Sequence, residues 1–341
     1  MKSSLTSIIL FIVAFSTMGQ GVLAPFSEVG SDKWGYMNQK GEVVLSAKYD
    51  EVLDFSAEDL ALVREGKTWS IIDEKGTAIS TVKEFTPVSI FGFGKRGYEN
   101  GYVVVGSNKL LGVLDVTGKV VHDFKYNYIS DFHGGFSAAK IGKSFYILDK
   151  DGKSKGIDDI LDLKEFQEGL APFRAKNKLY GFMDPTGKIV IDATFKSVGY
   201  FSNDLAWAKT TEGMIGFIDK SGKWTIEPKF LAAKEFDGTF GIAPVKLADE
   251  WMFVRKNGEM FAVDGMISSG NFSDGLVYAR KGDLYGFVNE KGEWVIEAKY
   301  AKVRDFNGGF AAVQVNELWG VIDKKGNVVC EPKFRDIKNF N

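Results

Sequence analysis

The chain has 341 residues, of which 45% are hydrophobic and 14% aromatic, and its 43 Lys and Arg against 45 Asp and Glu give a formal net charge of −2. This composition excludes a disordered chain and a sequence-independent nucleic-acid binder, which needs a basic surface. Two His and one Cys leave little for metal or nucleophile chemistry. We therefore expect a globular protein that is not an enzyme and has no metal site, no cofactor and no nucleic-acid partner.

The N-terminus has the pattern of a secretory signal peptide. Lys2 supplies a positive charge, residues 5–15 are largely apolar, and small residues follow at Thr17 and Gly19. The apolar stretch is shorter than the roughly 20 residues that a transmembrane helix needs. The pattern predicts a signal peptide at residues 1–19 and an exported protein, periplasmic or at the cell surface, with no transmembrane anchor after its removal.

The remaining residues, 20–341, are built from a repeat. A Phe recurs every 34 to 36 residues, at Phe132, Phe166, Phe201, Phe236, Phe272, Phe306 and Phe340. An anchor residue followed by Gly keeps the same interval, at Trp34-Gly35, Leu111-Gly112, Tyr180-Gly181, Ile215-Gly216, Tyr285-Gly286 and Trp319-Gly320. Together with three anchors that lack the Gly, these pairs define about nine units.

Each unit reads as three short β-strands. In the clearest unit, residues 205–209, 215–219 and 224–228 are short runs rich in aromatic and β-branched residues. Asp219 and Gly222 form an Asp-x-x-Gly signature, in which Asp bonds the backbone ahead of it and Gly tolerates a positive φ. This signature recurs in most units and predicts a tight hairpin between the second and third strands. We expect no helix.

Three units, near Trp69, Tyr146 and Trp251, are degenerate. They lack the Gly after the anchor, and they also lack the closing Lys-aromatic pair seen at Lys229-Phe230. The joint loss predicts that the Gly and the closing strand pack on one another, with the Gly permitting close backbone approach. Irregular segments follow these anchors and are expected to form loops, at residues 77–100, 153–165 and 259–271.

Units of this size must stack to bury an apolar core, which the recurrent Phe and the anchors are expected to fill. Closed propellers typically have 4–8 blades of four strands, which nine three-stranded units fit poorly. We therefore predict an all-β, open and curved β-solenoid-like array over residues 20–341. A closed β-propeller-like ring is the alternative.

The repeat resembles the WG repeat, also called the KWG repeat, of bacterial proteins. The best-matching stretch includes Trp319-Gly320, Asp323, Gly326 and Pro332, and the likeness extends from about Trp34 to Phe340. The resemblance implies a β-rich, often exported repeat module with no shared activity and no catalytic residues. It therefore supplies no site residues.

Local matches to ligand-binding motifs are better explained by turns and loops. Residues 92–97 have the GxGxxG spacing but lead into a strand, not into the helix that a dinucleotide site needs. His122 and His133 lack a third metal ligand at a convincing spacing, so we expect surface or loop histidines. Turn formation and charged loops likewise explain the carboxylate clusters, which are Asp149 with Asp151, and Asp158, Asp159 and Asp162.

Four aromatic residues outside the core pattern form the candidate ligand surface. Trp224 and Trp294 share one position of the repeat, and Trp207 and Tyr278 share another. Aromatic residues at equivalent places of stacked units could form a ladder for sugar rings or extended peptides. The alternative is that they are larger core residues.

Two functions follow from these observations. The first is an exported, non-enzymatic binding or scaffold module, expected to be a monomer, that offers a repeated surface to a protein partner. The second is a carbohydrate- or peptidoglycan-binding protein that uses the aromatic ladder. Exposed Trp side chains would favour the glycan, and buried ones the protein partner.

Overall fold

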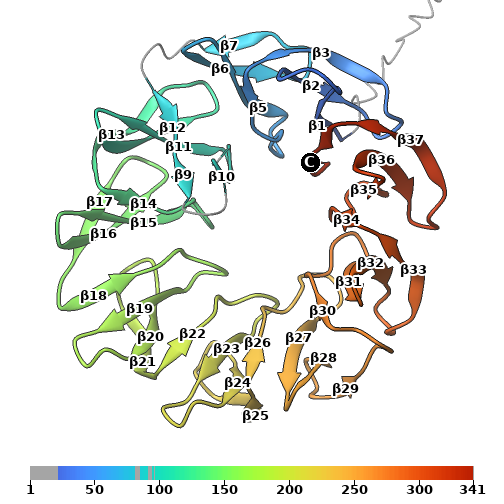
Figure 1. Cartoon of the computed structure of the whole chain (residues 1–341). Coiled ribbons are helices and arrows are strands. Elements are labelled where there is room, and N and C mark those ends of the chain that lie inside the picture. Colours follow the sequence, from blue (N-terminus) through green and yellow to red (C-terminus); the bar gives the residue numbers. More distant parts are fainter. Residues whose placement is uncertain (1–21, 81–84, 91–93, 96, 341) are drawn as a thin grey trace, which may run out of the picture.

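The fold is a closed ring of nine β-sheets (Figure 1). The computed structural model describes residues 22–80, 85–90, 94–95 and 97–340, and the elements assigned within them are all strands. Over these residues the strands form nine four-stranded antiparallel sheets and one two-stranded sheet, β9 (Ser89–Ile90) with β10 (Gly94–Lys95). We call the four-stranded sheets blades 1 to 9, in the chain order of their innermost strands.

The four strands of a blade run from the centre of the ring to its rim (Figure 1). The innermost strands are β4 (Glu51–Val52), β8 (Thr86–Pro87), β14 (Tyr128–Ile129), β18 (Ile160–Leu163), β22 (Ser197–Val198), β26 (Ala232–Ala233), β30 (Ser268–Ser269), β34 (Lys302–Val303) and β38 (Asp336–Ile337). The second strands are β5 (Leu60–Glu65), β11 (Tyr102–Ser107), β15 (Phe136–Ile141), β19 (Ala171–Ala175), β23 (Ala206–Lys209), β27 (Ile242–Leu247), β31 (Val277–Lys281), β35 (Phe310–Val315) and β1 (Ala24–Ser27). The third strands are β6 (Thr68–Asp73), β12 (Leu110–Asp115), β16 (Ser144–Asp149), β20 (Tyr180–Met183), β24 (Ile215–Ile218), β28 (Glu250–Arg255), β32 (Leu284–Val288), β36 (Leu318–Asp323) and β2 (Trp34–Met37). The outer strands are β7 (Ala78–Ser80), β13 (Val120–Tyr126), β17 (Ser154–Ile157), β21 (Ile189–Phe195), β25 (Trp224–Phe230), β29 (Met260–Phe261), β33 (Trp294–Tyr300), β37 (Val328–Phe334) and β3 (Val43–Tyr49).

The two ends of the described chain meet in blade 9, so the prediction of an open array is wrong and the alternative, a closed ring, is correct. Strand β38 pairs with β1, with Phe26 opposite Ile337 and Ser27 opposite Asp336. The Arg335 guanidinium adds contacts to the Ser27 hydroxyl at 3.2 Å and to the Asp32 carboxylate at 2.8 Å. A blade completed by both ends of the chain removes the open edges that an array would leave at its two ends.

The repeat count of nine is confirmed, but each sheet has four strands where three were predicted. The second, third and outer strands are the predicted ones, as β23, β24 and β25 show in blade 5. The fourth strand is the innermost one, which is only two residues long in eight blades. A strand this short carries no alternating pattern that a sequence could reveal.

The Gly after the anchor allows the outer strand to bulge over it. In blade 8, Trp319 pairs with Phe334 and Val321 with Cys330, so three residues of the outer strand lie opposite Gly320. A Cβ at Gly320 would stand 2.6 Å from the Cys330 carbonyl oxygen and 2.8 Å from the Pro332 nitrogen, closer than real atoms approach. The same contact to a carbonyl oxygen of the outer strand faces the equivalent glycines of the other five regular blades, Gly35, Gly112, Gly181, Gly216 and Gly286.

The three degenerate units confirm this pairing of features. Their outer strands have two to four residues, β7, β17 and β29, whereas the other six have seven. The expectation that residues 153–165 form a loop is wrong, because this segment holds the short outer strand β17 and the next innermost strand β18. Residues 259–271 do form a loop at 262–267, between the two-residue strands β29 and β30. Residues 77–100 hold β7 to β10, with gaps in the description.

The Asp-x-x-Gly turn joins the third and outer strands and also packs one blade on the preceding one. In blade 5, the Asp219 carboxylate accepts hydrogen bonds from the backbone of Ser221 at 2.8 Å and Lys223 at 3.1 Å. Gly222 has a φ of +84° and lies against Ile191 of blade 4. The same contact to the preceding outer strand recurs at Gly41, Gly76, Gly152, Gly187, Gly292 and Gly326.

The hydrophobic core lies between the blades, and the recurrent Phe is its main component. Phe236 of blade 6 meets the ring of Phe217 in blade 5 edge to face, with centroids 4.7 Å apart. The equivalent pairs are Phe182 with Phe201, Phe287 with Phe306, and Tyr36 with Phe55. Burying such a ring stabilises the fold by roughly 1.5–3 kcal/mol, which supports the prediction that this Phe fills the core.

The predicted signal peptide at residues 1–19 lies outside the described residues. Within the part that is described, no helix has the length and apolar character needed to cross a membrane.

Candidate functional site

The innermost strands and the segments that follow them form the hub of the ring (Figure 1). Each segment runs from an innermost strand to the recurrent aromatic residue and the polar residue after it. In three blades that polar residue donates a hydrogen bond to the aromatic residue's carbonyl in the next blade: Ser202 to Phe236 (2.5 Å), Ser273 to Phe306 (2.8 Å) and Asn307 to Phe340 (2.8 Å). These bonds hold the hub segments of neighbouring blades together.

A cation two residues before the aromatic residue makes a second contact between blades. Its side chain donates to a backbone carbonyl of the next innermost strand: Lys234 to Ser269 (2.6 Å), Arg304 to Ile337 (3.2 Å) and Lys338 to Val52 (2.8 Å). Arg304 and Lys338 also lie over the rings of Trp319 and Trp34, at 4.8 and 4.9 Å from the ring centroids. The carbonyls and rings therefore fix both cations in place.

A cavity of about 970 Å³ opens in the hub between blades 8, 9, 1 and 2. Its wall follows the chain through residues 51–58 of blade 1 and residues 97–100 of blade 2, and includes both of these cations. Five carboxylates line it, from Glu51, Asp54, Glu58, Glu99 and Asp336. Among the described wall residues the cations are Arg304 and Lys338, so carboxylates outnumber cations in the wall, although Glu51 also pairs with Arg64 at 3.3 Å.

Two carboxylate oxygens in this cavity are buried without a hydrogen-bond donor, Asp54 Oδ1 and Glu58 Oε2. Burial raises the pKa of Asp54, while the nearby charges of Lys338 and Arg304 act in the opposite direction. Burial also raises the pKa of Glu99, and His133 opposes that shift. Both pKa shifts show that negative charge is costly at this place in the free protein.

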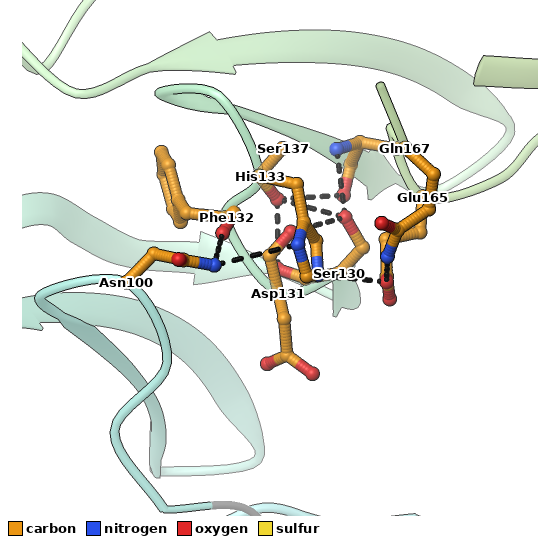
Figure 2. A network of polar contacts seen from close by, with 9 residues as sticks. Asn100, Ser130, Asp131, Phe132, His133, Ser137, Glu165 and Gln167 are labelled. Carbon is orange, nitrogen blue, oxygen red and sulfur yellow. Dashed lines mark hydrogen bonds and ion pairs between the residues drawn. The ribbon is translucent and has the colours of Figure 1, made fainter. Parts of the chain in front are cut away.

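A network of polar contacts joins the cavity wall to blades 3 and 4 (Figure 2). The Asn100 amide donates to the Phe132 carbonyl at 2.7 Å and lies 3.3 Å from His133 Nδ1. His133 Nε2 lies 2.9 Å from a Glu165 carboxylate oxygen, and this hydrogen bond is the main reason that the pKa of His133 is raised. The network makes His133 a link between blades rather than a metal ligand, and within the described residues no group of three or more His, Cys, Asp or Glu is placed to hold a metal ion.

Comparison with known proteins identifies the repeat. A family model described as "WG containing repeat" matches residues 34–69, 112–144, 180–212, 215–251, 285–319 and 319–341. These matches together cover more than half of the chain. The chain belongs to the WG-repeat family. The comparison with curated proteins found no match.

One solved structure agrees with the ring architecture over almost its full length. The crystal structure of a eukaryotic initiation factor is similar to this WG-repeat chain with a TM-score of 0.65 and 8% identity, covering 93% of this chain and 97% of the other. BamB from Moraxella catarrhalis matches with a TM-score of 0.38 and 13% identity, covering 77% of this chain and 93% of the other. Hsv2p of Kluyveromyces lactis matches with a TM-score of 0.37 and 14% identity, covering 58% of this chain and 75% of the other. At these identities the first likeness is one of fold, and it supports a nine-bladed β-propeller.

The WG-repeat propeller does not bring the four predicted aromatic site residues into one ladder. Trp207 and Trp224 belong to blade 5, yet Trp207 packs on the core shared with blade 6 and Trp224 on that shared with blade 4. In blade 7, Tyr278 likewise faces blade 8 and Trp294 faces blade 6. All four side chains are half-buried. Trp207 lies opposite Phe217 and Trp224 opposite Ile218, and successive residues of a strand face opposite sides of the sheet, so the two Trp side chains lie on opposite faces of blade 5.

Trp207 and Tyr278 instead replace the hub cation. Where these aromatic residues stand, the residue two before the recurrent Phe is a glycine, Gly199 or Gly270, and the aromatic ring occupies the space above it. The Trp207 indole donates to the Glu235 carboxylate at 3.2 Å, which again joins one blade to the next. The two residues thus have a structural role at the hub.

The expectation of surface histidines is wrong for His122, which is 3% exposed. It lies opposite Val113 on the inward face of outer strand β13, where the corresponding residue of β25 is Ile226. Its Nε2 lies 2.7 Å from the Asp149 carbonyl oxygen, and burial lowers its pKa. A histidine at a core position is recognised only once the register of the strand is known.

The structure explains two of the remaining sequence motifs. Asp149 forms a turn, since its carboxylate accepts hydrogen bonds from the backbone of Asp151 at 3.0 Å and Lys153 at 2.8 Å. Asp159 is exposed and paired with Lys176, which does not suit acid–base chemistry. Residues 91–93 and 96, within the GxGxxG motif, lie outside the described residues.

Sequence reasoning missed the hub residues. A usable signal was present, because a basic and an acidic residue precede the recurrent aromatic residue in Lys164-Glu165-Phe166, Lys234-Glu235-Phe236 and Arg304-Asp305-Phe306. Of these residues Arg304 alone lines the cavity, and the cavity itself follows only from closure of the ring, which brings Arg304, Asp336 and Lys338 beside residues 51–58.

Proposed function

We propose that this protein is an exported, non-enzymatic WG-repeat propeller that binds a protein partner at its hub. The observation that carries the proposal is the cavity of about 970 Å³ where blades 8, 9, 1 and 2 meet. A concave site with several converging polar groups is the usual form of a binding site. The signal-peptide pattern supports export, and the scarcity of His and Cys supports a role without catalysis.

The ring holds the cavity walls in position before any partner arrives. Ring contacts between blades, such as Phe287 with Phe306 at 4.6 Å, pack the core behind the hub. Hydrogen bonds between hub segments, such as Asn307 to Phe340, connect the wall residues themselves. Preorganised walls reduce the ordering cost of binding.

The charge of the cavity indicates which partner surface it fits. Carboxylates outnumber cations in its wall, so a partner with a basic surface would be attracted and oriented. The aromatic residues favour a protein over a glycan, because Trp207, Trp224 and Trp294 pack between blades and offer no continuous platform.

The proposal is tested by affinity capture from cell-envelope extract with two matched variants. Glu58→Lys reverses one charge in the cavity, and Glu227→Lys makes the same change on the exposed face of β25 at the rim. We expect the wild type and Glu227→Lys to capture the same protease-sensitive species, and Glu58→Lys to lose it while keeping its melting temperature. Equal capture by all three proteins would reject binding at the hub, and capture that survives protease digestion of the extract would indicate a glycan.

A further inference from the structure

The hub cavity lies where blade 1 departs from the pattern of its neighbours. In blades 6, 8 and 9 the residue that pairs its backbone N–H with the second strand is a cation, as in Arg304 to Ala312 (2.9 Å) and Lys338 to Pro25 (3.0 Å). In blade 1 the same hydrogen bond is made by Leu53, to Leu62 at 2.9 Å. Leu53 turns its side chain into the core and supplies no charge to the hub.

The acidic residue that follows is retained in blade 1. Asp54 stands directly before the recurrent Phe55, as Glu235 and Asp305 stand before theirs. In blade 8, Asp305 lies near the charges of Lys234 and Arg304, the second from its own segment, whereas Asp54 lies near those of Lys338 and Arg304, both from other blades. Blade 1 therefore keeps the carboxylate of the hub pattern and lacks the cation of its own segment.

The two cations that reach this cavity are already engaged. Lys338 donates to the Val52 carbonyl, and Arg304 donates to the Ile337 carbonyl with its guanidinium 3.4 Å from Asp336. Among the described residues, none donates a hydrogen bond to Asp54 Oδ1 or to Glu58 Oε2. Buried acceptors without donors cost free energy, which a donor brought by a ligand would recover.

We propose that the hub cavity receives a lysine or arginine side chain of the protein partner, whose cationic head lies beside Asp54 and Glu58 and supplies the charge that the blade 1 segment lacks. This inference rests on the proposed function and names the group that the hub recognises. An ammonium offers three N–H donors and a guanidinium five, enough for both orphaned oxygens. Hydrogen bonds between such a cation and a carboxylate are stronger than neutral ones.

The other hub variants support an organic cation over other occupants. In blades 5 and 7 an aromatic ring fills the space above a glycine, Trp207 over Gly199 and Tyr278 over Gly270, so those blades leave no vacancy of this kind. A metal ion is a poorer fit, because the described residues include no cluster of three or more suitable ligands. Blade 3 also lacks the cation, with Ser130 in its place and Asp131 before Phe132, but among the described residues it is the blade 1 carboxylate, Asp54, that lines the cavity.

The test is isothermal titration of the full chain with capped pentapeptides, Gly-Gly-Lys-Gly-Gly, its Arg counterpart and its acetyl-lysine counterpart, and with spermidine. We expect the Lys and Arg peptides to bind and the acetyl-lysine peptide not to bind. Asp54→Asn should weaken binding by about tenfold or more, because it replaces a charged acceptor by a neutral amide. The matched control Asp305→Asn changes the equivalent residue of blade 8, which does not line the cavity, and should leave binding within about twofold of wild type.

A second variant tests the vacancy itself. Leu53→Lys restores the hub cation in blade 1 and should abolish peptide binding by occupying the site from within. Binding of the acetyl-lysine peptide, or equal binding by Asp54→Asn and wild type, would overturn the proposal. Tight binding of spermidine without the peptides would assign the site to a free polyamine instead. These outcomes are distinct from failure of the proposed function, in which the captured partner is indifferent to Glu58→Lys.

Discussion

Replacing the glycine of a WG pair by alanine tests why the motif recurs. In Gly320→Ala the new Cβ would stand 2.6 Å from the Cys330 carbonyl oxygen and 2.8 Å from the Pro332 nitrogen. Both neighbours are backbone atoms of β37, which is paired with β36 on either side of the bulge. Relief requires the outer strand to move by about 0.8 Å to reach an ordinary contact distance of about 3.4 Å, and no side-chain rotation can replace that movement.

We expect Gly320→Ala to destabilise the ring by about 3 kcal/mol, the upper end of the usual cost of overpacking, because two backbone atoms are obstructed at once. An unfolding entropy of about 2.1 cal/mol/K per residue converts this to a fall in melting temperature of about 5 °C for cooperative unfolding of the described chain. Differential scanning calorimetry measures the shift, and urea unfolding measures the change in free energy.

Gly238→Ala is the matched control. Its Cβ would meet no atom within 4 Å, and its φ lies outside the left-handed region. We expect a change of at most about 0.5 kcal/mol, or a slight stabilisation from reduced freedom of the unfolded chain. A melting temperature for Gly320→Ala that matches Gly238→Ala within 1 °C would refute the argument that the bulge requires glycine.

Two further substitutions separate the roles of turn and hub residues. Gly41 and Gly30 both have positive φ, +76° and +81°. Of the two, only Gly41 would bring a Cβ against another blade, with Cys330 Sγ at 2.5 Å. Gly41→Ala should therefore lower the free energy of unfolding, measured in urea, by about 1–2 kcal/mol more than Gly30→Ala does. Equal losses would mean that the turn does not stabilise packing between blades. The hydrogen bond to Glu165 raises the pKa of His133, so the native state keeps the imidazole proton at pH values above the unfolded pKa of about 6.5. The resulting stabilisation of the native state is present at low pH and is lost as the pH rises through the folded pKa. His133→Gln should therefore lose more stability at pH 5.5 than at pH 9, and a loss independent of pH would contradict this role.

The features that sequence predicts well are those determined within one unit. The hairpin of β24 and β25 follows from apolar runs on either side of Asp219 and Gly222, and local turn chemistry is enough to specify it. The packing of glycine on the closing strand could be predicted because three units lost both features together. Such comparison within one chain replaces part of the information that a mutation series would supply.

The features that sequence misses depend on contacts between units. Innermost strands such as β26 have two residues and are recognisable only by their pairing with β27. The burial of His122 depends on a register that places it at the inward position of β13. The candidate site is the extreme case, because Glu58 and Lys338 are distant in sequence and meet only when the ring closes.

The order of the strands along the chain nevertheless explains why the ring closes. In blades 1 to 8 the innermost strand comes before the other three strands of its sheet. In blade 9 the order is reversed, because β1 to β3 precede every innermost strand and the innermost strand β38 is the last strand of the described chain. In an open array these would be two incomplete sheets, one with an uncovered inner edge at β1 and one with an isolated strand at β38. Pairing β38 with β1 completes both sheets as one blade. This pairing also brings Lys338 to the Val52 carbonyl and forms one wall of the hub cavity. The same offset of the repeat therefore closes the fold and builds the site.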